Sequence, residues 1–292
     1  MRSTPRTPNT REALNVAKEM ISDAIVENLD IKSLTATSRT IRIVDLGCSH
    51  PLKGNTIPRA YHLISLNSKW FNDHVSNDFN TLFASLPPDR KYFVAGVPGS
   101  FYEQLFPSSS LRVVHSSYAL HWLSKVPEQL LDKNSPSWNK GRIHYAGASD
   151  DVVSAYAAQF EKDFEIFLNV KSKEITGGGM MILIVPGLPE DIHHAKLPTG
   201  ILFNFLGSSL VEMVNAGIVS EPQLDLFNLP ISIYAPSPKE MTKLVEKKWC
   251  FSIEKMEVTD PRLKIDGPIN LQALIMQPKS RHGRSFCPTL WT

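Results

Sequence analysis

Short apolar runs alternate with amphipathic stretches along this chain, and this alternation constrains the fold more than any other feature. Apolar runs bounded by turn residues predict buried strands at residues 41–46, 91–97, 112–115 and 180–185. Apolar side chains at three- and four-residue spacing predict helices at residues 10–29, 78–85 and 150–174. Strands joined by helical crossovers pair in parallel. The sequence therefore predicts an α/β fold with a doubly wound, mostly parallel sheet.

The pattern changes after Pro186. Residues 201–216 and 238–247 predict helices, residues 225–234 an extended loop, and residues 251–258 and 271–276 two further strands. The three glycines at 177–179 are expected to end the long helix. We expect a single domain over residues 1–292, with a core at 10–185, a mostly helical cap at 186–235 and a return to the core sheet at 236–276.

The composition is typical of a soluble globular domain, because 42% of residues are hydrophobic and 21% are charged. A formal net charge of +2 argues against a nucleic-acid surface. No apolar stretch reaches the roughly 18 residues of a membrane span, and the N-terminus lacks the apolar segment of a secretory signal. Cys48, Cys250 and Cys287 are too widely separated to suggest a zinc site. We therefore expect a cytoplasmic protein that binds neither nucleic acid nor membranes.

Two acidic residues, Asp45 and Asp73, are candidates for contacts to a nucleoside. Asp45 and Gly47 close the first strand, and a doubly wound sheet holds a nucleoside at this position. The absence of a G-x-G-x-x-G pattern makes NAD the weaker choice of nucleotide. Asp73 comes soon after the loop that follows the first strand, and a carboxylate at the end of the second strand of such a sheet can accept both ribose hydroxyl protons. Taken alone, a plain strand-ending turn explains Asp45 equally well, and a helix N-cap explains Asp73.

Aromatic and hydroxyl side chains follow the next two predicted strands, at residues 96–102 and 115–124. An aromatic face can stack on adenine and can attract a sulfonium cation. The ring N–H groups of His121 and Trp122 can orient an anionic oxygen. The alternative is a cluster of aromatic core residues whose polar tips are satisfied.

These segments resemble the plant SABATH family of S-adenosylmethionine-dependent carboxyl methyltransferases, and they occur in the family's order. The residues that carry the resemblance are DLGCS at 45–49, FNDHVSNDFN at 71–80, GVPGSFYEQLFP at 96–107, SSYALHWLSKVP at 116–127, WNKGRIH at 138–144 and LDLFNLPISIYAPS at 224–237. The resemblance implies a class I methyltransferase-like Rossmann fold and S-adenosylmethionine as the cofactor. It also implies a homodimer and a small acid of the salicylate, benzoate, jasmonate, indole-acetate or farnesoate class as the substrate.

The resemblance implies roles for individual residues. Cofactor contacts would come from Asp45, Gly47, Cys48, Asn55, Asp73, His74, Ser100, Phe101 and Ser117. Contacts to the methyl acceptor would come from Tyr118, His121 and Trp122. A magnesium ion would be bound at Asn139, Asp225, Phe227 and Asn228, and a structural clamp between core and cap is the alternative for these four positions.

The implied reaction requires no catalytic side chain. A carboxylic acid with a pKa near ~4–5 is already ionised at neutral pH, so its oxygen can attack the methyl group directly once the two are aligned. The chain also departs from the family pattern at residues 1–8, in the loop at 48–56, in the short segment between Thr56 and Asp73, and after Met276. These departures leave an alternative open, namely a catalytically impaired member that binds a small acid or serves as a dimer partner.

Overall fold

The structure is a computed structural model that describes residues 21–25, 27, 41–48, 66–139, 142–190, 192–220 and 232–258. Four of the predicted site residues lie outside the described residues, namely Asn55, Asp225, Phe227 and Asn228. The predicted strand at 271–276 and most of the predicted helix at 10–29 also lie outside them. Residues 21–25 of that predicted helix are helical.

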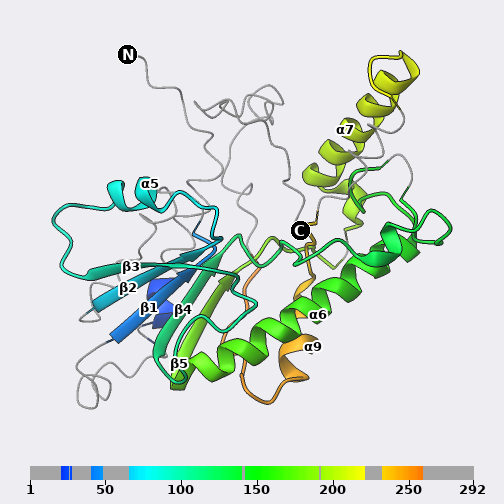
Figure 1. The fold of residues 1–292 in the computed structure, drawn as a ribbon. Coiled ribbons are helices and arrows are strands. Elements are labelled where there is room, and N and C mark those ends of the chain that lie inside the picture. Colours follow the sequence, from blue (N-terminus) through cyan, green and yellow to red (C-terminus); the bar gives the residue numbers. More distant parts are fainter. Residues whose placement is uncertain are drawn as a thin grey trace, which may run out of the picture.

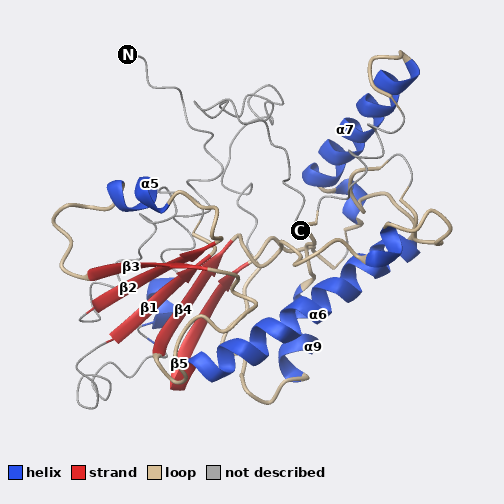
Figure 2. Cartoon of the chain, in the orientation of Figure 1, coloured by secondary structure: helices blue, strands red, loops and turns tan. Residues whose placement is uncertain are grey.

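Five strands form one sheet (Figures 1 and 2). They are β1 (Ile41–Leu46), β2 (Leu66–Asp73), β3 (Phe93–Pro98), β4 (Leu111–Ser117) and β5 (Ile175–Ile184). Their spatial order is β3-β2-β1-β4-β5, and every neighbouring pair is parallel. The strand β1 therefore lies at the centre, with β2 on one side and β4 on the other. The predicted parallel α/β sheet is confirmed.

Helices cover both faces of the sheet. Successive residues of a strand point to these two faces in turn, so each face has its own set of apolar side chains. On one face, the helix α6 (Asp150–Glu174) packs over Val44, Leu46 and Val114 with a row of aromatic side chains, namely Tyr156, Phe160, Phe164 and Phe167. On the other face, Ile21 and Ile25 pack against Ile41, Ile43 and Val113. A short helix, α5 (Phe79–Ala84), places Leu82 against Phe71 of β2. The sheet is therefore doubly wound, as predicted.

The remaining elements follow the sheet or connect its parts. They are the 3-10 turns η1 (Glu128–Leu130) and η2 (His194–Lys196) and the helices α7 (Pro198–Asn215) and α9 (Pro238–Glu246). Figure 1 shows α7 extending away from the sheet, whereas α9 lies beside α6. None of the helices in the described ranges combines the length and apolar character needed to cross a bilayer.

Three local predictions require correction or refinement. The glycines at 177–179 do not end the long helix: α6 ends at Glu174, Ile175 is already extended, and the glycines belong to β5. They form an irregularity in the pairing with β4, where Leu111 pairs with Ile175 but Val113 pairs with Met180. Residues 251–258 form no strand. β2, which has 8 residues, was not among the predicted strands.

Candidate functional site

The carboxyl ends of the strands are joined to one another by backbone hydrogen bonds. Cys48 N donates to Asn72 O at 2.9 Å, which joins the turn after β1 to the end of β2. Gly99 N donates to Asp73 O at 3.0 Å, which joins the turn after β3 to β2. Tyr118 N donates to Ile184 O at 2.8 Å, which joins the turn after β4 to β5. The structure therefore brings the predicted cofactor loops together along one edge of the sheet, where parallel α/β sheets bind ligands.

Gly47 lies where three of these loops meet. Its φ angle is +68°, a left-handed conformation that favours glycine. A Cβ atom added at this position would lie 2.3 Å from Cβ of Ala119 and 3.6 Å from Cε1 of Phe101. The loops after β3 and β4 can therefore approach the turn after β1 this closely because residue 47 has no side chain.

Asp45 lies inside the sheet and is surrounded by two basic side chains. His115 Nδ1 lies 2.8 Å from its Oδ1, and Lys69 Nζ lies 3.4 Å from its Oδ2. All three side chains are buried. Burial alone would raise the pKa of Asp45, but His115 and Lys69 outweigh it and lower this pKa to about 2. Both carboxylate oxygens are thus engaged with protein groups, and a contact between Asp45 and a cofactor stays a prediction.

Cys48 and Asn72 support the turn after β1 in different ways. Cys48 is 1% exposed and packs with Phe71 and Leu82, so it helps to fix the turn after β1 from the core side. Asn72 is completely buried, and its Nδ2 donates to Val97 O at 2.8 Å and to Gly99 O at 2.9 Å. Asn72 was not predicted as a site residue, although it lies within the motif that contains Asp73.

Asp73 ends β2, as the sequence predicts for a residue that holds a ribose. The amide of His74 donates to Asp73 Oδ1 at 2.8 Å, which fixes the carboxylate beside the turn after β3. In that turn, Ser100 O accepts from Glu103 N at 2.9 Å. The Phe101 ring lies edge-on to Phe167 of α6, with centroids 6.1 Å apart. The predicted ribose and adenine residues are therefore adjacent at one end of the sheet.

The predicted acceptor residues follow β4 directly. Ser117 is the last residue of that strand and is buried. Tyr118 has a φ angle of 52°, which is uncommon outside glycine, and is 36% exposed. Trp122 is 45% exposed, and its ring lies 5.6 Å from that of His121. Two exposed aromatic side chains at a ligand-binding edge suit contact with a small organic molecule better than a role in the core.

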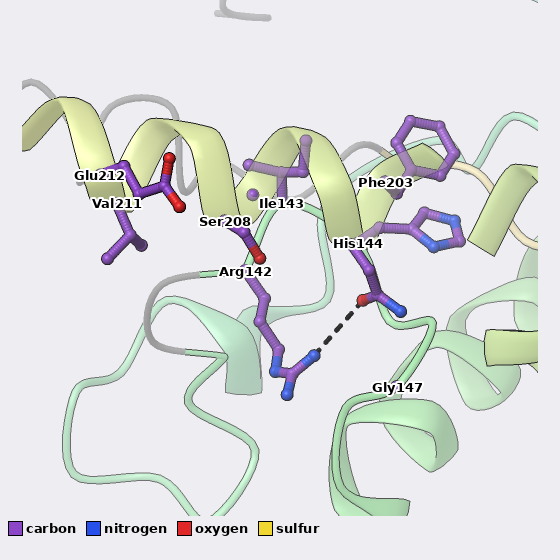
Figure 3. Close-up of a pocket in the computed structure, with 10 residues that line it drawn as sticks. Arg142, Ile143, His144, Gly147, Phe203, Ser208, Val211 and Glu212 are labelled. Carbon is purple, nitrogen blue, oxygen red and sulfur yellow. Dashed lines mark hydrogen bonds between the residues drawn. The ribbon is translucent and has the colours of Figure 1, made fainter. Parts of the chain in front are cut away.

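A pocket of about 700 Å³ lies between α7 and the loop at residues 142–147 (Figure 3). Its lining combines apolar with charged and polar side chains, and it includes Arg142, His144, Phe203, Asn204, Ser208 and Glu212. The Phe203 ring stacks on His144 with centroids 4.3 Å apart, and Arg142 Nη1 donates to Asn204 Oδ1 at 3.4 Å. Burial, followed by the charge of His194, lowers the pKa of His144 to about 4. None of the predicted site residues lines this pocket, although the cap residues near 201–213, where the acceptor pocket is expected, contribute to it.

Asn139 is the one predicted magnesium ligand among the described residues. It is 7% exposed, and its Nδ2 donates to His144 O at 3.1 Å. Because its amide nitrogen is engaged in this way, the side-chain oxygen is the atom that fits a hard cation. Within the described ranges, no group of three His, Cys, Asp or Glu side chains could hold a metal ion.

Comparisons with known proteins agree with this geometry. A family profile described as SAM dependent carboxyl methyltransferase matches residues 7–280. The chain is 42% identical to a loganic acid O-methyltransferase of Catharanthus roseus over 287 residues, covering 91% of this chain and 75% of that protein. It is 40% identical to a farnesoic acid carboxyl-O-methyltransferase of Arabidopsis thaliana over 256 residues, covering 82% of this chain and 71% of that protein. Among solved structures, a loganic acid methyltransferase with SAH superimposes with a TM-score of 0.84 at 38% identity, covering 91% of this chain and 78% of that one.

Proposed function

Because the chain belongs to the SABATH family of S-adenosylmethionine-dependent carboxyl methyltransferases, we propose that it methylates the carboxylate of a small organic acid. The observation that carries the proposal is the meeting of three loops around Gly47 at the carboxyl edge of the sheet. Loganic acid and farnesoic acid, named for two of the relatives, are the first acceptors to examine.

The cofactor would lie across the carboxyl ends of β1, β2 and β3. We assign the ribose hydroxyls to Asp73, whose carboxylate is fixed by the His74 amide. We assign the adenine to the turn that contains Ser100 and Phe101. When bound, S-adenosylmethionine supplies a methyl group that its sulfonium charge makes electrophilic. Asn72 would hold the Gly99 turn in place for it through two hydrogen bonds.

The acceptor would be oriented by the loop after β4. We assign its carboxylate to His121 and Trp122, whose ring N–H groups can donate to an anionic oxygen. We assign the cationic methyl donor to the faces of the Tyr118 and Trp122 rings. Since the acceptor is ionised at neutral pH, none of these side chains has to remove a proton. Their work is to align the two reactants and to exclude water.

We place the body of the acceptor in the pocket beside α7, which belongs to the predicted cap. A series of aromatic rings leads there from the acceptor loop and supports the assignment. Tyr234 N donates to His121 O at 2.8 Å, and the Tyr234 ring lies 5.4 Å from that of Tyr145. The neighbouring ring of His144 stacks on Phe203 in the pocket.

The polar lining of this pocket favours an acid that carries hydroxyl groups besides its carboxylate. Ser208→Trp would fill the pocket and is expected to raise the acceptor KM while the affinity for S-adenosylhomocysteine stays unchanged. An unchanged acceptor KM would show that the acceptor lies elsewhere. We further propose a magnesium ion at Asn139, where its charge would join the core to the cap.

We also propose a cytoplasmic homodimer. The exposed apolar side chains of α7, namely Ile201, Phe205 and Leu206, support a partner surface on this helix. Light scattering of the purified protein tests the oligomeric state.

Titration of the purified protein with S-adenosylhomocysteine tests the proposed function. We expect binding in the micromolar range, and methyl transfer to at least one acid in a panel that pairs hydroxylated acids with hydrocarbon analogues. A cooperatively folded protein that does not bind at millimolar ligand would contradict the cofactor assignment. Binding without transfer to any acid would favour the alternative of a small-acid binder or dimer partner.

A further inference from the structure

Two buried carboxylates lie on the same face of α6, and no predicted motif includes them. Asp163 is 2% exposed and Glu174 is completely buried. They are eleven residues apart, which corresponds to about three helical turns. A carboxylate removed from water must be compensated by hydrogen bonds or opposite charges. The partners of these two carboxylates therefore indicate what each one holds in place.

Glu174 holds the segment that follows the cofactor loop of β3. Its Oε1 accepts from Leu105 N at 2.6 Å and from Phe106 N at 3.0 Å. Its Oε2 lies 2.6 Å from Lys171 Nζ, and this ammonium group also donates to Glu103 O at 3.4 Å. Residues 103–106 follow Ser100 and Phe101 in the same loop, so this ion pair fixes the end of the loop that we assign to adenine.

Asp163 holds the acceptor loop of β4 instead. Its Oδ2 accepts from Ser124 N at 2.8 Å, and its Oδ1 accepts from Ser124 Oγ at 2.6 Å. Gln159 Nε2 donates to the same Oδ1 at 2.8 Å. Ser124 comes two residues after Trp122, so the hydrogen bonds of Asp163 fix the end of the loop that we assign to the acceptor.

We propose that Asp163 and Glu174, the latter paired with Lys171, are positioning residues that set the two substrate loops at a defined separation along α6. The proposal rests on the proposed function, in which catalysis depends on alignment. A helix suits this task because its rise per residue is fixed. Replacing buried charges by apolar side chains of similar volume is often neutral for stability, so the presence of these charges fits a role in geometry.

Two pairs of variants distinguish the effect of Glu174 on its loop from the effect of Asp163 on the other loop. Lys171→Met with Glu174→Leu removes both charges and the acceptor for the amides of Leu105 and Phe106, whereas Lys171→Met with Glu174→Gln restores an acceptor oxygen. Asp163→Leu removes the acceptor for Ser124, and Asp163→Asn restores one. Neither pair leaves an isolated buried charge, which would unfold the chain for an unrelated reason.

Hydrogen–deuterium exchange of the full chain without ligand gives a readout that does not depend on activity. The Leu variant at 174 is expected to raise exchange at residues 100–106 alone, and to weaken S-adenosylhomocysteine binding about tenfold, as for lost hydrogen bonds to a charged group. The Leu variant at 163 is expected to raise exchange at residues 118–124 alone and to raise the acceptor KM by about the same factor. The Gln variant at 174 should restore exchange and cofactor affinity, and the Asn variant at 163 should restore exchange and acceptor KM.

The proposal would be overturned if either Leu variant raised exchange in both loops, or in neither loop. It would also be overturned if the two Leu variants had the same effects on cofactor affinity and on acceptor KM. A wild-type protein that does not bind S-adenosylhomocysteine would instead contradict the proposed function. The exchange data would still decide whether each carboxylate fixes its own loop.

Discussion

Gly47 is the residue at which the site tolerates least change. Gly47→Ala should strain the left-handed backbone by about 1–2 kcal/mol, and its methyl group would also collide with Ala119. We expect a lower melting temperature and loss of S-adenosylhomocysteine binding, measured by thermal unfolding and calorimetry.

Gly217→Ala is the matched control for this change. Gly217 has a φ angle of +71°, but a Cβ atom there would meet no atom within 4 Å. This control carries the backbone strain without the collision, and it should keep its affinity for the ligand. Equal losses in the two variants would contradict a packing role for Gly47.

Asp45 makes the free energy of unfolding depend on pH in the acidic range. Since its pKa is lowered from 3.8 to about 2, the ionised form stabilises the fold above pH 4 and this contribution disappears as the pH falls to 2. The shift corresponds to about 2 kcal/mol. Urea unfolding between pH 5 and pH 2 should show this extra loss in the wild type but not in Asp45→Asn combined with Lys69→Met. Parallel curves for the two proteins would contradict the assignment.

The residues at the edge of the sheet could be predicted because one rule covers them all. Ligand-binding residues follow the strands of a parallel sheet, and Gly47, Asp73, Ser100 and Tyr118 lie at those positions. Lys69 and His115 could not be predicted, because they meet Asp45 across strand pairs whose order the sequence does not state. The contacts of Glu174 were missed for a similar reason, since its partners come from a loop far away in sequence.

The N-termini of α6 and α9 offer a direct test of helix capping. Ser237 begins α9 with a complete capping box: its side chain accepts from Glu240 N, and the Glu240 side chain accepts from Ser237 N. Ser149 begins α6 without a side-chain cap. Ser237→Ala should therefore lower the free energy of unfolding by about 1 kcal/mol, and Ser149→Ala should change it little. Chemical denaturation measures both, and equal effects would argue against the capping box.

The predicted elements differ from the observed ones where a partner segment decides the structure. Glycines after a helix usually indicate its end, but residues 177–179 continue into β5 because β4 provides a neighbouring strand, and Arg112 Nη1 donates to Gly177 O at 2.9 Å. Residues 251–258 alternate apolar and polar side chains like a strand, yet they pair with no described strand. Alternation alone indicates a capacity to pair and does not supply the partner.

At the scale of the whole molecule, His144 makes the junction between core and α7 sensitive to pH. Its pKa is lowered from 6.5 to about 4, so the neutral form is favoured in the folded state. The free energy of unfolding should therefore fall by about 3 kcal/mol as the pH decreases from 6.5 to 4. His144→Phe keeps a ring against Phe203 and should remove most of this slope, leaving the contribution of His194, whose pKa is also lowered by burial. A slope that persists in the variant would assign the acid sensitivity to another group.

The parallel sheet was predictable as a class of fold, whereas its strand order was not. Alternating strands and helices require crossovers, and crossovers favour parallel pairing. Nothing in the pattern states that β1 lies between β2 and β4, and this placement brings the loops after β1, β3 and β4 together at Gly47.

The central position of β1 also has a consequence for folding during synthesis on the ribosome. This strand is the first of the described strands to leave the ribosome, but one of its neighbours comes much later: the contact between Asp45 and His115 joins residues 70 apart. Until then an apolar strand keeps an unpaired edge, and pairings between distant segments form slowly. Depletion of chaperones should therefore lower the yield of folded protein, because the central strand has to wait for β4 before both of its edges are paired.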